Sequence, residues 1–356
     1  MKAVTTLEPG QTVGVLKQAL QEVYGADAQL ETWTSDAQFT EHGKRRVVRY
    51  DLQAHVAGLP NPQHCQWVGK YYEEEGQALL VASVLRIIGC NEAARAAGLV
   101  VPKVLSYYAP CHLLFLTYES GESVTTAIPG ETEAILATMG RALAALHGMQ
   151  ITPPTTTSPA TVLAELRWRV EDLSAWFAGE ESNLRKAFAQ LGDQAPKPPS
   201  PISFIHNDFG PANLLWRAGE LIVLDFDKCA RGDPALDLGN FLVQLRRRSI
   251  CHPERFRDFA AARRALFEAY ERWSSPDRGL GDRVTWYERA ILLRKAHRLC
   301  LEGKNQGSDE GAQHIVDGHR LLTAFLEDSA PEGGSTLDTA GGFAPLLFES
   351  KASEAK

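Results

Sequence analysis

The chain has 356 residues, 44% of them hydrophobic and 23% charged, and its 37 basic and 44 acidic side chains give a net charge of −7. This composition is typical of a folded globular protein and excludes a disordered chain, a collagen-like fibre and a coiled coil. The acidic balance argues against a nucleic-acid partner. At about 150 residues per domain, the length predicts two domains or two lobes of one fold.

Membrane and secretion signals are not recognisable in the sequence. No stretch approaches the roughly 18 uninterrupted apolar residues that a spanning helix requires, and Met1–Val15 lacks a basic start followed by an apolar run. We therefore expect a cytoplasmic protein with no membrane partner. The six cysteines form no CxxC pair, so reduced thiols and no zinc site are expected. The sequence leaves the oligomeric state open.

The first third of the chain predicts mostly strands. β-branched and aromatic residues favour an antiparallel pair of strands, separated by a break rich in Gly and Pro over 58–62. Alanine and leucine at helical spacing then predict a helix. The expected elements are the helix Val13–Tyr24, the strands Arg46–His55 and His64–Tyr72, the helix Gln77–Ala97, and the strands Val104–Tyr108 and Leu113–Tyr118. This order predicts a small mixed lobe over residues 1–120.

From residue 121 the pattern is mainly helical. The expected helices are Glu131–Met149, Ala160–Phe177, Glu181–Leu191, one that begins after Pro234, Phe256–Trp273 and Val284–Glu302. The helix after Pro234 carries Leu238, Phe241, Leu242 and Leu245 on one face. We expect a helical lobe over 121–330, followed by a mobile tail over 331–356 that is rich in Gly, Ser and Glu.

The strongest chemical signal is the run FIHNDFGPAN at 204–213, which has the pattern HxDxxxxN. A carboxylate at Asp208 can accept a hydroxyl proton and hold a nucleophile in line with a terminal phosphate. His206 is better placed to brace this loop than to transfer protons. Three fixed positions also occur by chance, so the pattern gains its weight from the residues after Asn213.

A predicted hairpin brings two oxygen ligands together after this run. The apolar segments Leu214–Trp216 and Leu221–Leu224 flank a four-residue loop, and this spacing sets Asn213 opposite Leu224. Asn213 and Asp225 then emerge side by side, with Cβ atoms about 5 Å apart. An amide oxygen and a carboxylate at one point suit Mg²⁺, which takes few carboxylates together with substrate phosphates.

These motifs resemble the aminoglycoside phosphotransferase and choline kinase family, which has the protein-kinase-like fold. HNDFGPAN, LDFD at 224–227 and GDPALDL at 232–238 occur in order, and the resemblance covers roughly Leu30–Leu326. It implies an α+β, two-lobed fold, with a small mixed β-sheet N-lobe and a larger, mostly helical C-lobe. It also implies an enzyme that moves the γ-phosphoryl group of ATP or GTP to a small-molecule hydroxyl with Mg²⁺.

The resemblance implies roles for five residues around the catalytic segment. Asp208 resembles the catalytic base, and Asn213 and Asp225 resemble the metal ligands. Asp227 is expected to contact metal-bound water or to shape its loop. Asp237 resembles the buried aspartate that hydrogen-bonds the catalytic loop, so its implied role is structural.

In the first lobe, Trp67–Lys70 resembles the strand whose lysine contacts the nucleotide phosphates, which makes Lys70 the phosphate ligand. The segment 113–121 resembles the linker between lobes, where backbone groups of Thr117 and Glu119 would bind the adenine edge. The lysine's partner, a helical glutamate in this fold, is represented by Glu92 or Glu75. Leu146–His147 at a helix end also fits the family.

Two departures from the family keep alternatives open. The loop 35–46 holds one glycine rather than several, and 77–88 contains no acidic residue. A pseudokinase that binds nucleotide or a partner protein without turnover is therefore the main alternative, and a metal phosphoesterase is a third. An amino-sugar, an amino-alcohol and a sugar remain open as acceptors. The basic runs Lys44–Arg46 and Arg246–Arg248 are short and are predicted to be solvated faces.

Overall fold

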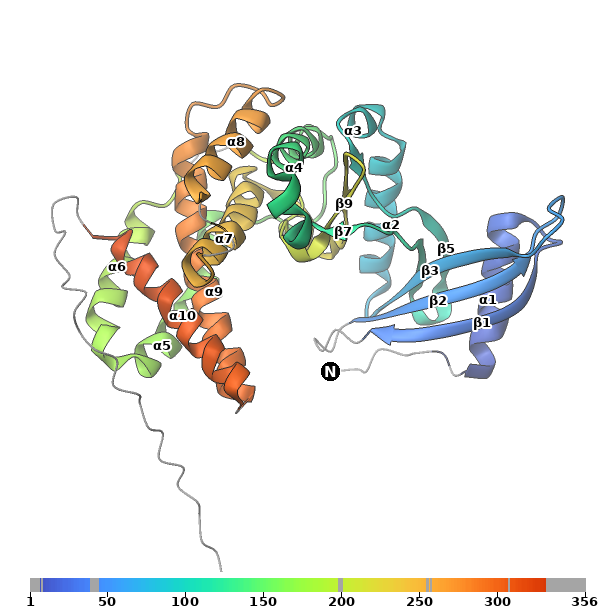
Figure 1. The fold of residues 1–356 in the computed structure, drawn as a ribbon, viewed down its shortest axis with the longest axis horizontal. Coiled ribbons are helices and arrows are strands. Elements are labelled where there is room, and N and C mark those ends of the chain that lie inside the picture. The colour runs from blue at the N-terminus through green and yellow to red at the C-terminus, as the bar shows by residue number, and fades with distance from the viewer. Residues whose placement is uncertain are drawn as a thin grey trace, which may run out of the picture.

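A sheet-containing part extends away from a larger helical part in the computed structural model (Figure 1). The structure describes residues 7, 9–38, 45–197, 201–253, 256, 258–306 and 308–330. The predicted tail over 331–356 and most of the loop after the first strand lie outside these residues. The mixed first part and the helical second part agree with the α+β, two-lobed fold expected from the sequence.

The first part is built on a five-stranded antiparallel sheet in the order β1-β2-β3-β6-β5. Its elements are α1 (Pro9–Tyr24), β1 (Gln29–Gln38), β2 (Arg45–His55), β3 (Gln63–Tyr72), α2 (Glu75–Cys90), α3 (Glu92–Ala96), β4 (Leu99–Val100), β5 (Val104–Tyr108) and β6 (Leu113–Thr117). The pairing of β2 with β3 confirms the predicted antiparallel pair. Leu16 and Leu20 of α1 pack against Leu52 and Phe115 of the sheet in a small separate core.

In this part, one predicted helix is wrong and one strand was missed. The predicted helix Gln77–Ala97 is two helices, because Asn91 has extended backbone angles and its side chain accepts a hydrogen bond from the Ala94 amide at 2.9 Å. Asparagine is a favoured N-cap, so this residue ends one helix and begins the next. The strand β1 was not predicted, since its sequence QLETWTSDAQ is mostly polar, as suits an edge strand.

The second part contains seven helices among the described residues. They are α4 (Val124–His147), α5 (Pro159–Trp176), α6 (Glu181–Asp193), α7 (Ala235–Cys251), α8 (Phe259–Glu271), α9 (Leu280–Gln306) and α10 (Asp309–Glu327). Its short strands are β7 (Glu122–Ser123), β8 (Ser203–Ile205), β9 (Leu214–Arg217), β10 (Glu220–Val223) and β11 (Ala230–Gly232). The helix α10 was not predicted. Glycine lowers helix propensity, but Gly318 lets α10 approach α9, because a Cβ there would lie 2.4 Å from the Cys300 sulfur.

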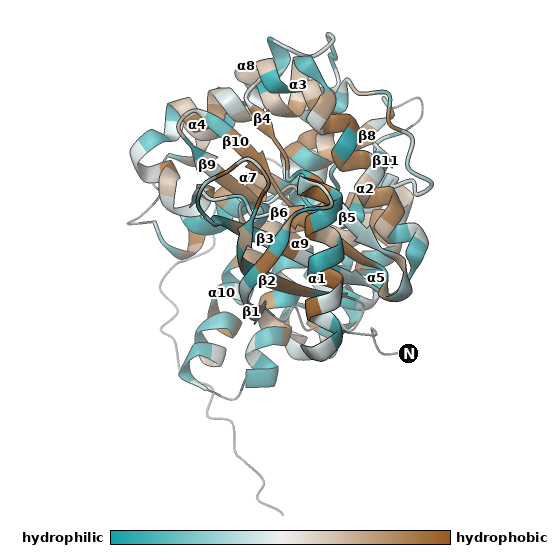
Figure 2. Ribbon diagram, turned by 90° about the vertical axis from the view of Figure 1, so that its right-hand side faces the viewer, coloured by the Kyte–Doolittle hydropathy of each residue, from teal (hydrophilic) through white to brown (hydrophobic). Residues whose placement is uncertain are grey.

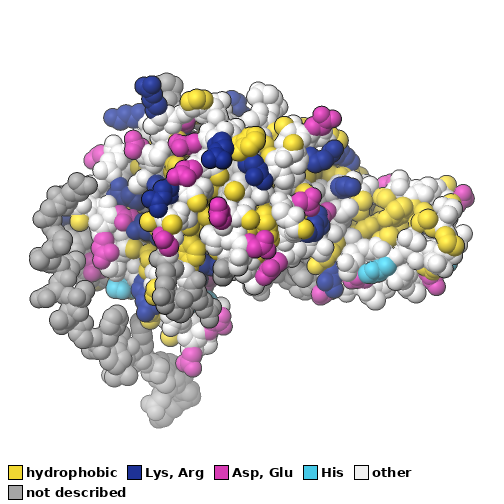
Figure 3. Space-filling view, turned by 45° about the horizontal axis from the view of Figure 1, so that its top comes forward, with side chains coloured by type: hydrophobic (Ala, Val, Ile, Leu, Met, Phe, Trp, Pro, Cys, Tyr) yellow, Lys and Arg dark blue, Asp and Glu magenta, His cyan; other side chains and the backbone are white. Residues whose placement is uncertain are grey.

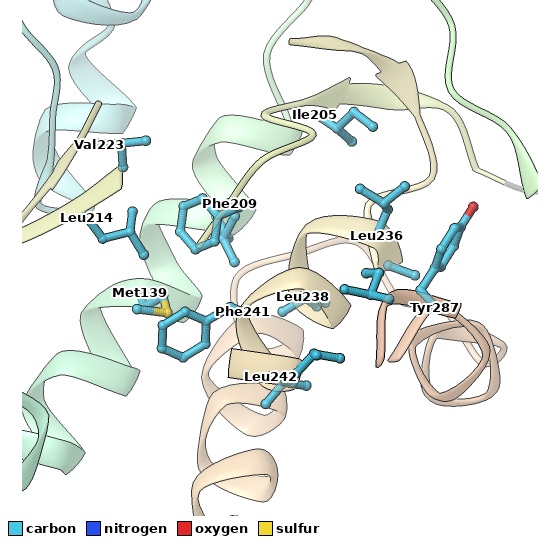
Figure 4. Close-up of a cluster of buried hydrophobic side chains, with 14 of the residues drawn as sticks. Met139, Ile205, Phe209, Leu214, Val223, Leu236, Leu238, Phe241, Leu242 and Tyr287 are labelled. Atoms are coloured by element: carbon cyan, nitrogen blue, oxygen red, sulfur yellow. The ribbon is translucent and has the colours of Figure 1, made fainter. Parts of the chain in front are cut away.

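A second sheet, in the order β4-β10-β9-β7, connects the two parts. The strand β4 pairs in parallel with β10, with Leu99 opposite Leu221, and both strands are strongly hydrophobic in Figure 2. The predicted apolar face of α7 is buried. In Figure 4 the Phe241 side chain lies beside Met139 of α4, Phe209 lies next to Leu214, and Val223 is farther along the same cluster. The catalytic segment therefore rests on a continuous hydrophobic core.

Close packing of α4 against α8 leads to a stability prediction. A Cβ at Gly140 would lie 2.5 Å from the Ala269 Cβ and 2.6 Å from the Tyr270 amide nitrogen. Gly140→Ala is expected to lower the free energy of unfolding by about 1–3 kcal/mol, because overpacking outweighs the gain in helix propensity. Gly192→Ala in α6 is the control, since its Cβ would meet nothing within 4 Å. Equal urea midpoints for the two variants would contradict the prediction.

Candidate active site

The loop 206–213, which the sequence predicts to be the catalytic loop, is held by Asp237 in the first turn of α7. Its carboxylate is fully buried and accepts hydrogen bonds from the His206 amide at 2.7 Å and the Asn207 amide at 2.8 Å. The His147 Nε2 atom, at the end of α4, lies 3.2 Å from the same carboxylate. This is the structural contact that the family resemblance implied for Asp237.

The His206 ring braces the loop from inside. Its Nε2 atom lies 2.8 Å from the Leu224 carbonyl oxygen, and its Nδ1 atom accepts a hydrogen bond from the Asp208 amide at 3.3 Å. This network assigns the proton to Nε2, which donates to the carbonyl. The ring is fully buried beside Phe209 and Phe226, so it is not exposed to a substrate.

The hairpin β9–β10 has the predicted register, with Trp216 opposite Leu221. The Leu224 amide donates to the Asn213 carbonyl oxygen at 2.8 Å, so Asn213 and Leu224 lie opposite each other as expected. The predicted four-residue loop is wrong, because its outer residues pair within the strands. Ala218 and Gly219 alone make the turn, with φ values of 48° and 89°. Positive φ at both positions is typical of the tightest hairpin turns.

Two oxygen ligands follow from this hairpin. The Asn213 side-chain nitrogen donates to the Asp208 carbonyl oxygen at 3.0 Å. The side-chain oxygen of Asn213 is therefore the atom that could coordinate a metal ion. Asp225 has φ 61° and ψ 68°, a left-handed conformation that is unusual for a residue other than glycine. Strained backbone of this kind is typical of functional sites. An amide oxygen and a carboxylate fit Mg²⁺, which also takes oxygens from substrate phosphates.

Lys70 lies between the two carboxylates of the DFD motif. Its Nζ atom is 3.0 Å from Asp225 Oδ1 and 2.7 Å from Asp227 Oδ1, and its side chain is 9% exposed. The Tyr72 hydroxyl also donates to Asp227 Oδ1, at 3.0 Å. Burial alone would lower the pKa of Lys70, but Tyr72 and the carboxylates of Asp227 and Asp225 together outweigh it and raise this pKa above its usual value. The lysine therefore stays charged.

The structure does not bring Glu92 to this lysine. Among the described residues, the ion-pair partners of Lys70 are Asp225 and Asp227, while Glu92 is exposed in the first turn of α3. From the first turn of α2, Gln77 instead donates to the Asp227 carbonyl oxygen at 2.6 Å. The neutral side-chain amide of Gln77 thus connects α2 to the loop 225–227. Sequence analysis missed this contact because it considered only glutamates as helical partners.

Asp208 lies at the surface of the cavity, with its side chain 38% exposed. Its Oδ2 atom accepts a hydrogen bond from the Lys228 ammonium at 2.8 Å. Burial raises the pKa of Asp208, but the charge and hydrogen bond of Lys228 more than compensate, and the pKa lies below its usual value. The carboxylate is therefore ionised at neutral pH. Lys228 directly follows the DFD motif, and sequence analysis assigned it no role.

Thr117 and Glu119 lie between the two parts of the molecule but do not line the cavity. The Thr117 amide already donates to the Lys103 carbonyl oxygen at 2.9 Å, so this amide is not available to a nucleotide base. The Thr117 hydroxyl donates to Glu119 at 2.7 Å, and Glu119 pairs with Arg217 at 3.3 Å. These side chains connect the linker to the hairpin turn.

The predicted catalytic and metal-binding residues line one large cavity. Its volume is about 1320 Å³, and it is lined by residues of both parts, including Asp208, Asn213, Asp225 and Asp227. Sites for one small ligand are usually about 300–1,000 Å³, so this cavity has room for two ligands at once. No group of three or more His, Cys, Asp or Glu side chains that could hold a metal occurs in the described part of the chain.

The arginine run of α7 is not simply a solvated face, which corrects the prediction for Arg246–Arg248. Arg246 pairs with Asp328 at 2.7 Å, and Arg248 donates to the Thr125 carbonyl oxygen at 2.7 Å. Arg247 and Arg248 line the cavity. The signal that was missed is the spacing of polar residues opposite the buried face of the same helix.

Comparisons with known proteins point to one family. A model of the phosphotransferase enzyme family matches residues 66–279, more than half of the chain. No curated protein matches the chain by sequence. None of the helices in the described part of the chain combines the length and apolar character that crossing a membrane requires.

Several solved structures share the fold at low sequence identity. A macrolide 2'-phosphotransferase from Brachybacterium faecium is 18% identical, with 88% of this chain and 98% of that chain covered and a TM-score of 0.53. A ternary complex of an aminoglycoside phosphotransferase with streptomycin and ATP is 14% identical, with 91% and 99% covered and a TM-score of 0.53. A choline/ethanolamine kinase family protein from Mesorhizobium loti is 15% identical, with 89% and 98% covered and a TM-score of 0.50.

Proposed function

The chain belongs to the phosphotransferase enzyme family, and on this basis we propose that it transfers the γ-phosphoryl group of a nucleoside triphosphate to a hydroxyl group of a small molecule. The observation that carries the proposal is the Lys70 ammonium held by Asp225 and Asp227 beside the loop that presents Asp208 and Asn213. Asp208, Asn213, Asp225 and Asp227 line one cavity, and Lys70 forms ion pairs with the last two of them. ATP is the expected donor, as in the streptomycin complex of the related fold, and GTP is the alternative.

Each of these groups has a role in the proposed reaction. Asp208 accepts a hydrogen bond from the acceptor hydroxyl and orients its oxygen toward the γ-phosphorus, while Lys228 keeps the carboxylate ionised. Lys70 binds the donor phosphates. Asn213 and Asp225 would hold Mg²⁺, which would supply charge neutralisation at the donor phosphates. Because the transition state is loose, catalysis consists mainly of positioning and charge stabilisation.

The pseudokinase alternative rested on the sparse glycines and on the missing helical glutamate. The second reason loses its force, because Lys70 has two carboxylate partners without a helical glutamate. A metal phosphoesterase commonly needs a second metal with histidine ligands. The buried His206 is engaged with Leu224 and Asp208, which favours the phosphotransferase.

Calorimetric titration of ATP, with and without Mg²⁺, tests the donor site. We expect wild-type binding to depend on Mg²⁺ and the Asp225→Asn variant to lose at least tenfold in affinity, because one metal ligand and one partner of Lys70 are removed. Asp282→Asn, at an exposed residue early in α9, is the matched control and is expected to bind like the wild type.

Three outcomes separate the hypotheses. Mg²⁺-dependent binding that is lost only in the Asp225 variant supports the assigned donor site, and ADP production in the presence of a hydroxyl compound then separates the phosphotransferase from a nucleotide-binding pseudokinase. ATP binding that ignores both Mg²⁺ and the substitution contradicts the assigned metal site. No binding of ATP, and then none of GTP, supports a scaffold or pseudokinase function.

A further inference from the structure

The wall of the cavity formed by α7 and α9 is rich in basic side chains. Asn240, Gln244, Arg247 and Arg248 line it from α7, and Lys295, Arg298, Leu299 and Glu302 line it from α9. Within each helix the lining residues recur every three or four positions, so they lie on one face of that helix. The two helices lie side by side (Figure 1), so the two faces form one continuous surface. We call the basic side chains of this surface, Arg247, Arg248, Lys295 and Arg298, the basic wall.

Two basic side chains of the wall, Arg247 and Lys295, have no carboxylate partner in the described part of the chain. Arg298 pairs with Glu302 at 2.6 Å. Among the described residues, however, neither Arg247 nor Lys295 has a hydrogen bond or an ion pair, although both are half-buried. Burial, together with the like charges of Arg298, Arg294 and Arg247, lowers the pKa of Lys295 to about 8. Such a cluster is electrostatically unfavourable until an anion binds.

A further, half-buried arginine contacts the wall through Asn240. Arg294 donates to the Asn240 side-chain oxygen at 2.9 Å, and Asp208 contributes favourably to its charged state. Burial lowers the pKa of Arg294, but a guanidinium remains charged at neutral pH. The positive potential therefore extends toward the residue assigned to the acceptor hydroxyl.

We propose that the acceptor carries an anionic group, a carboxylate or a phosphate ester, that binds Arg247 and Lys295 while its hydroxyl faces Asp208. This inference rests on the proposed phosphotransferase function and narrows its substrate class. It disfavours the amino-sugars and amino-alcohols that the overall charge of −7 left open. On the face shown in Figure 3, basic and acidic side chains are interspersed over the helical part, so the basic character belongs to the cavity wall.

The position of the wall favours the acceptor over the nucleotide. Asp237, which touches the catalytic loop, and Arg247 are ten residues apart on α7, which is about 15 Å along a helix axis. Of the groups assigned to the donor phosphates, Lys70 belongs to β3 of the first part and Asp225 follows β10. On the side of the first part, the cavity is lined by Glu73 and Glu74 rather than by basic residues. The basic wall is therefore distinct from the donor site.

A binding experiment tests the wall without knowledge of the natural acceptor. The donor site is first filled with a non-hydrolysable ATP analogue and Mg²⁺, and inorganic sulfate is then titrated by calorimetry. The wild type is expected to bind sulfate, and the double variant Arg247→Gln/Lys295→Met to bind it at least tenfold more weakly, because charge-assisted hydrogen bonds are lost. The matched control is Arg272→Gln/Lys186→Met, which changes two exposed residues that do not line the cavity.

The pH dependence provides a second readout that a purely structural role would not change. Because the Lys295 ammonium loses its proton near pH 8, sulfate affinity is expected to fall as the pH rises through this value. Lys295→Met removes this dependence. The charged groups around Lys295 are Arg294 and Arg298 of α9, Arg247 of α7 and Asp208 of the catalytic loop. His314 of α10 lines the same cavity, so His314→Gln is included as a control.

Competition identifies the class of anion. Tartrate and glycerol 3-phosphate represent the carboxylate and the phosphate ester, and glycerol and ethanolamine represent neutral and cationic hydroxyl compounds. At least one of the two anions is expected to displace sulfate. Displacement by neither anion, or tighter binding of ethanolamine, overturns the proposal. Failure to bind the ATP analogue instead contradicts the proposed function itself, so the two failures are distinguishable.

Discussion

Asp208→Asn is expected to lower kcat by about 10³-fold while Mg²⁺-dependent nucleotide binding stays within about threefold of the wild type. A positioned base contributes about 10²–10⁴ in rate, and asparagine has no charge with which to orient a hydroxyl proton. Nucleotide binding is preserved for a structural reason. The Asn213 side chain bonds the main-chain carbonyl of Asp208 at 3.0 Å, and the substitution leaves that carbonyl in place.

The measurement combines ADP production in the presence of an accepted hydroxyl compound with calorimetric titration of ATP. Asp282→Asn again serves as the control for loss of one carboxylate. Near-normal turnover by the Asp208 variant would remove this residue from the mechanism. Loss of nucleotide binding together with turnover would show that Asp208 acts on the donor site instead.

Site residues that are close together in the sequence were predictable from it. The catalytic loop and the hairpin occupy 206–225, and the opposition of Asn213 and Leu224 follows from counting along one hairpin. The length of the turn was not predictable, because Ala218 adopts a positive φ that its residue type disfavours. Local pattern thus placed Asn213 and Leu224 opposite each other although the predicted length of the loop between the strands was wrong.

Site features that depend on distant segments were not predictable. Lys70 meets Asp227 across 157 positions of the chain, and no local spacing distinguishes that partner from a helical glutamate. The basic wall has the same origin, because Arg247 and Lys295 belong to different helices that only packing brings together. Three consecutive arginines were predicted to be solvated, but successive residues of a helix point in different directions. Arg246 pairs with Asp328, whereas Arg247 and Arg248 line the cavity.

The fold shows the same limit. The helix α10 packs on α9 through glycines such as Gly303 and Gly311, where a Cβ would lie 2.4 Å and 2.8 Å from the carbonyl oxygen of the other. Glycine counts against a helix when single-sequence propensity is the only guide. Its advantage, close approach of two backbones, exists only once the partner helix is in place. Tertiary packing therefore overrides propensity in this region.

The largest effect on stability is expected for Asp237→Ala, with a loss of about 3–5 kcal/mol in the free energy of unfolding. The substitution leaves the amides of His206 and Asn207 buried without an acceptor, and each unsatisfied donor costs about 1–3 kcal/mol. It also removes one of the two partners of His147, whose side chain is 3% exposed and whose other ring nitrogen lies 2.9 Å from the Tyr270 hydroxyl. Removing one member of a buried pair is costly because water cannot replace it.

Asp172→Ala is the matched control, because it breaks the same kind of pair at a carboxylate that is partly exposed, while the histidine of the pair is buried as in the Asp237 pair. Asp172 lies 2.8 Å from His297 Nε2, but its side chain is 41% exposed, so water can replace the lost contact. A loss of at most about 1 kcal/mol is expected there. Urea denaturation followed by circular dichroism measures both variants. Similar midpoints for the two would mean that Asp237 does not support the loop. A large difference ties the stability of the helical core to the loop that carries Asp208.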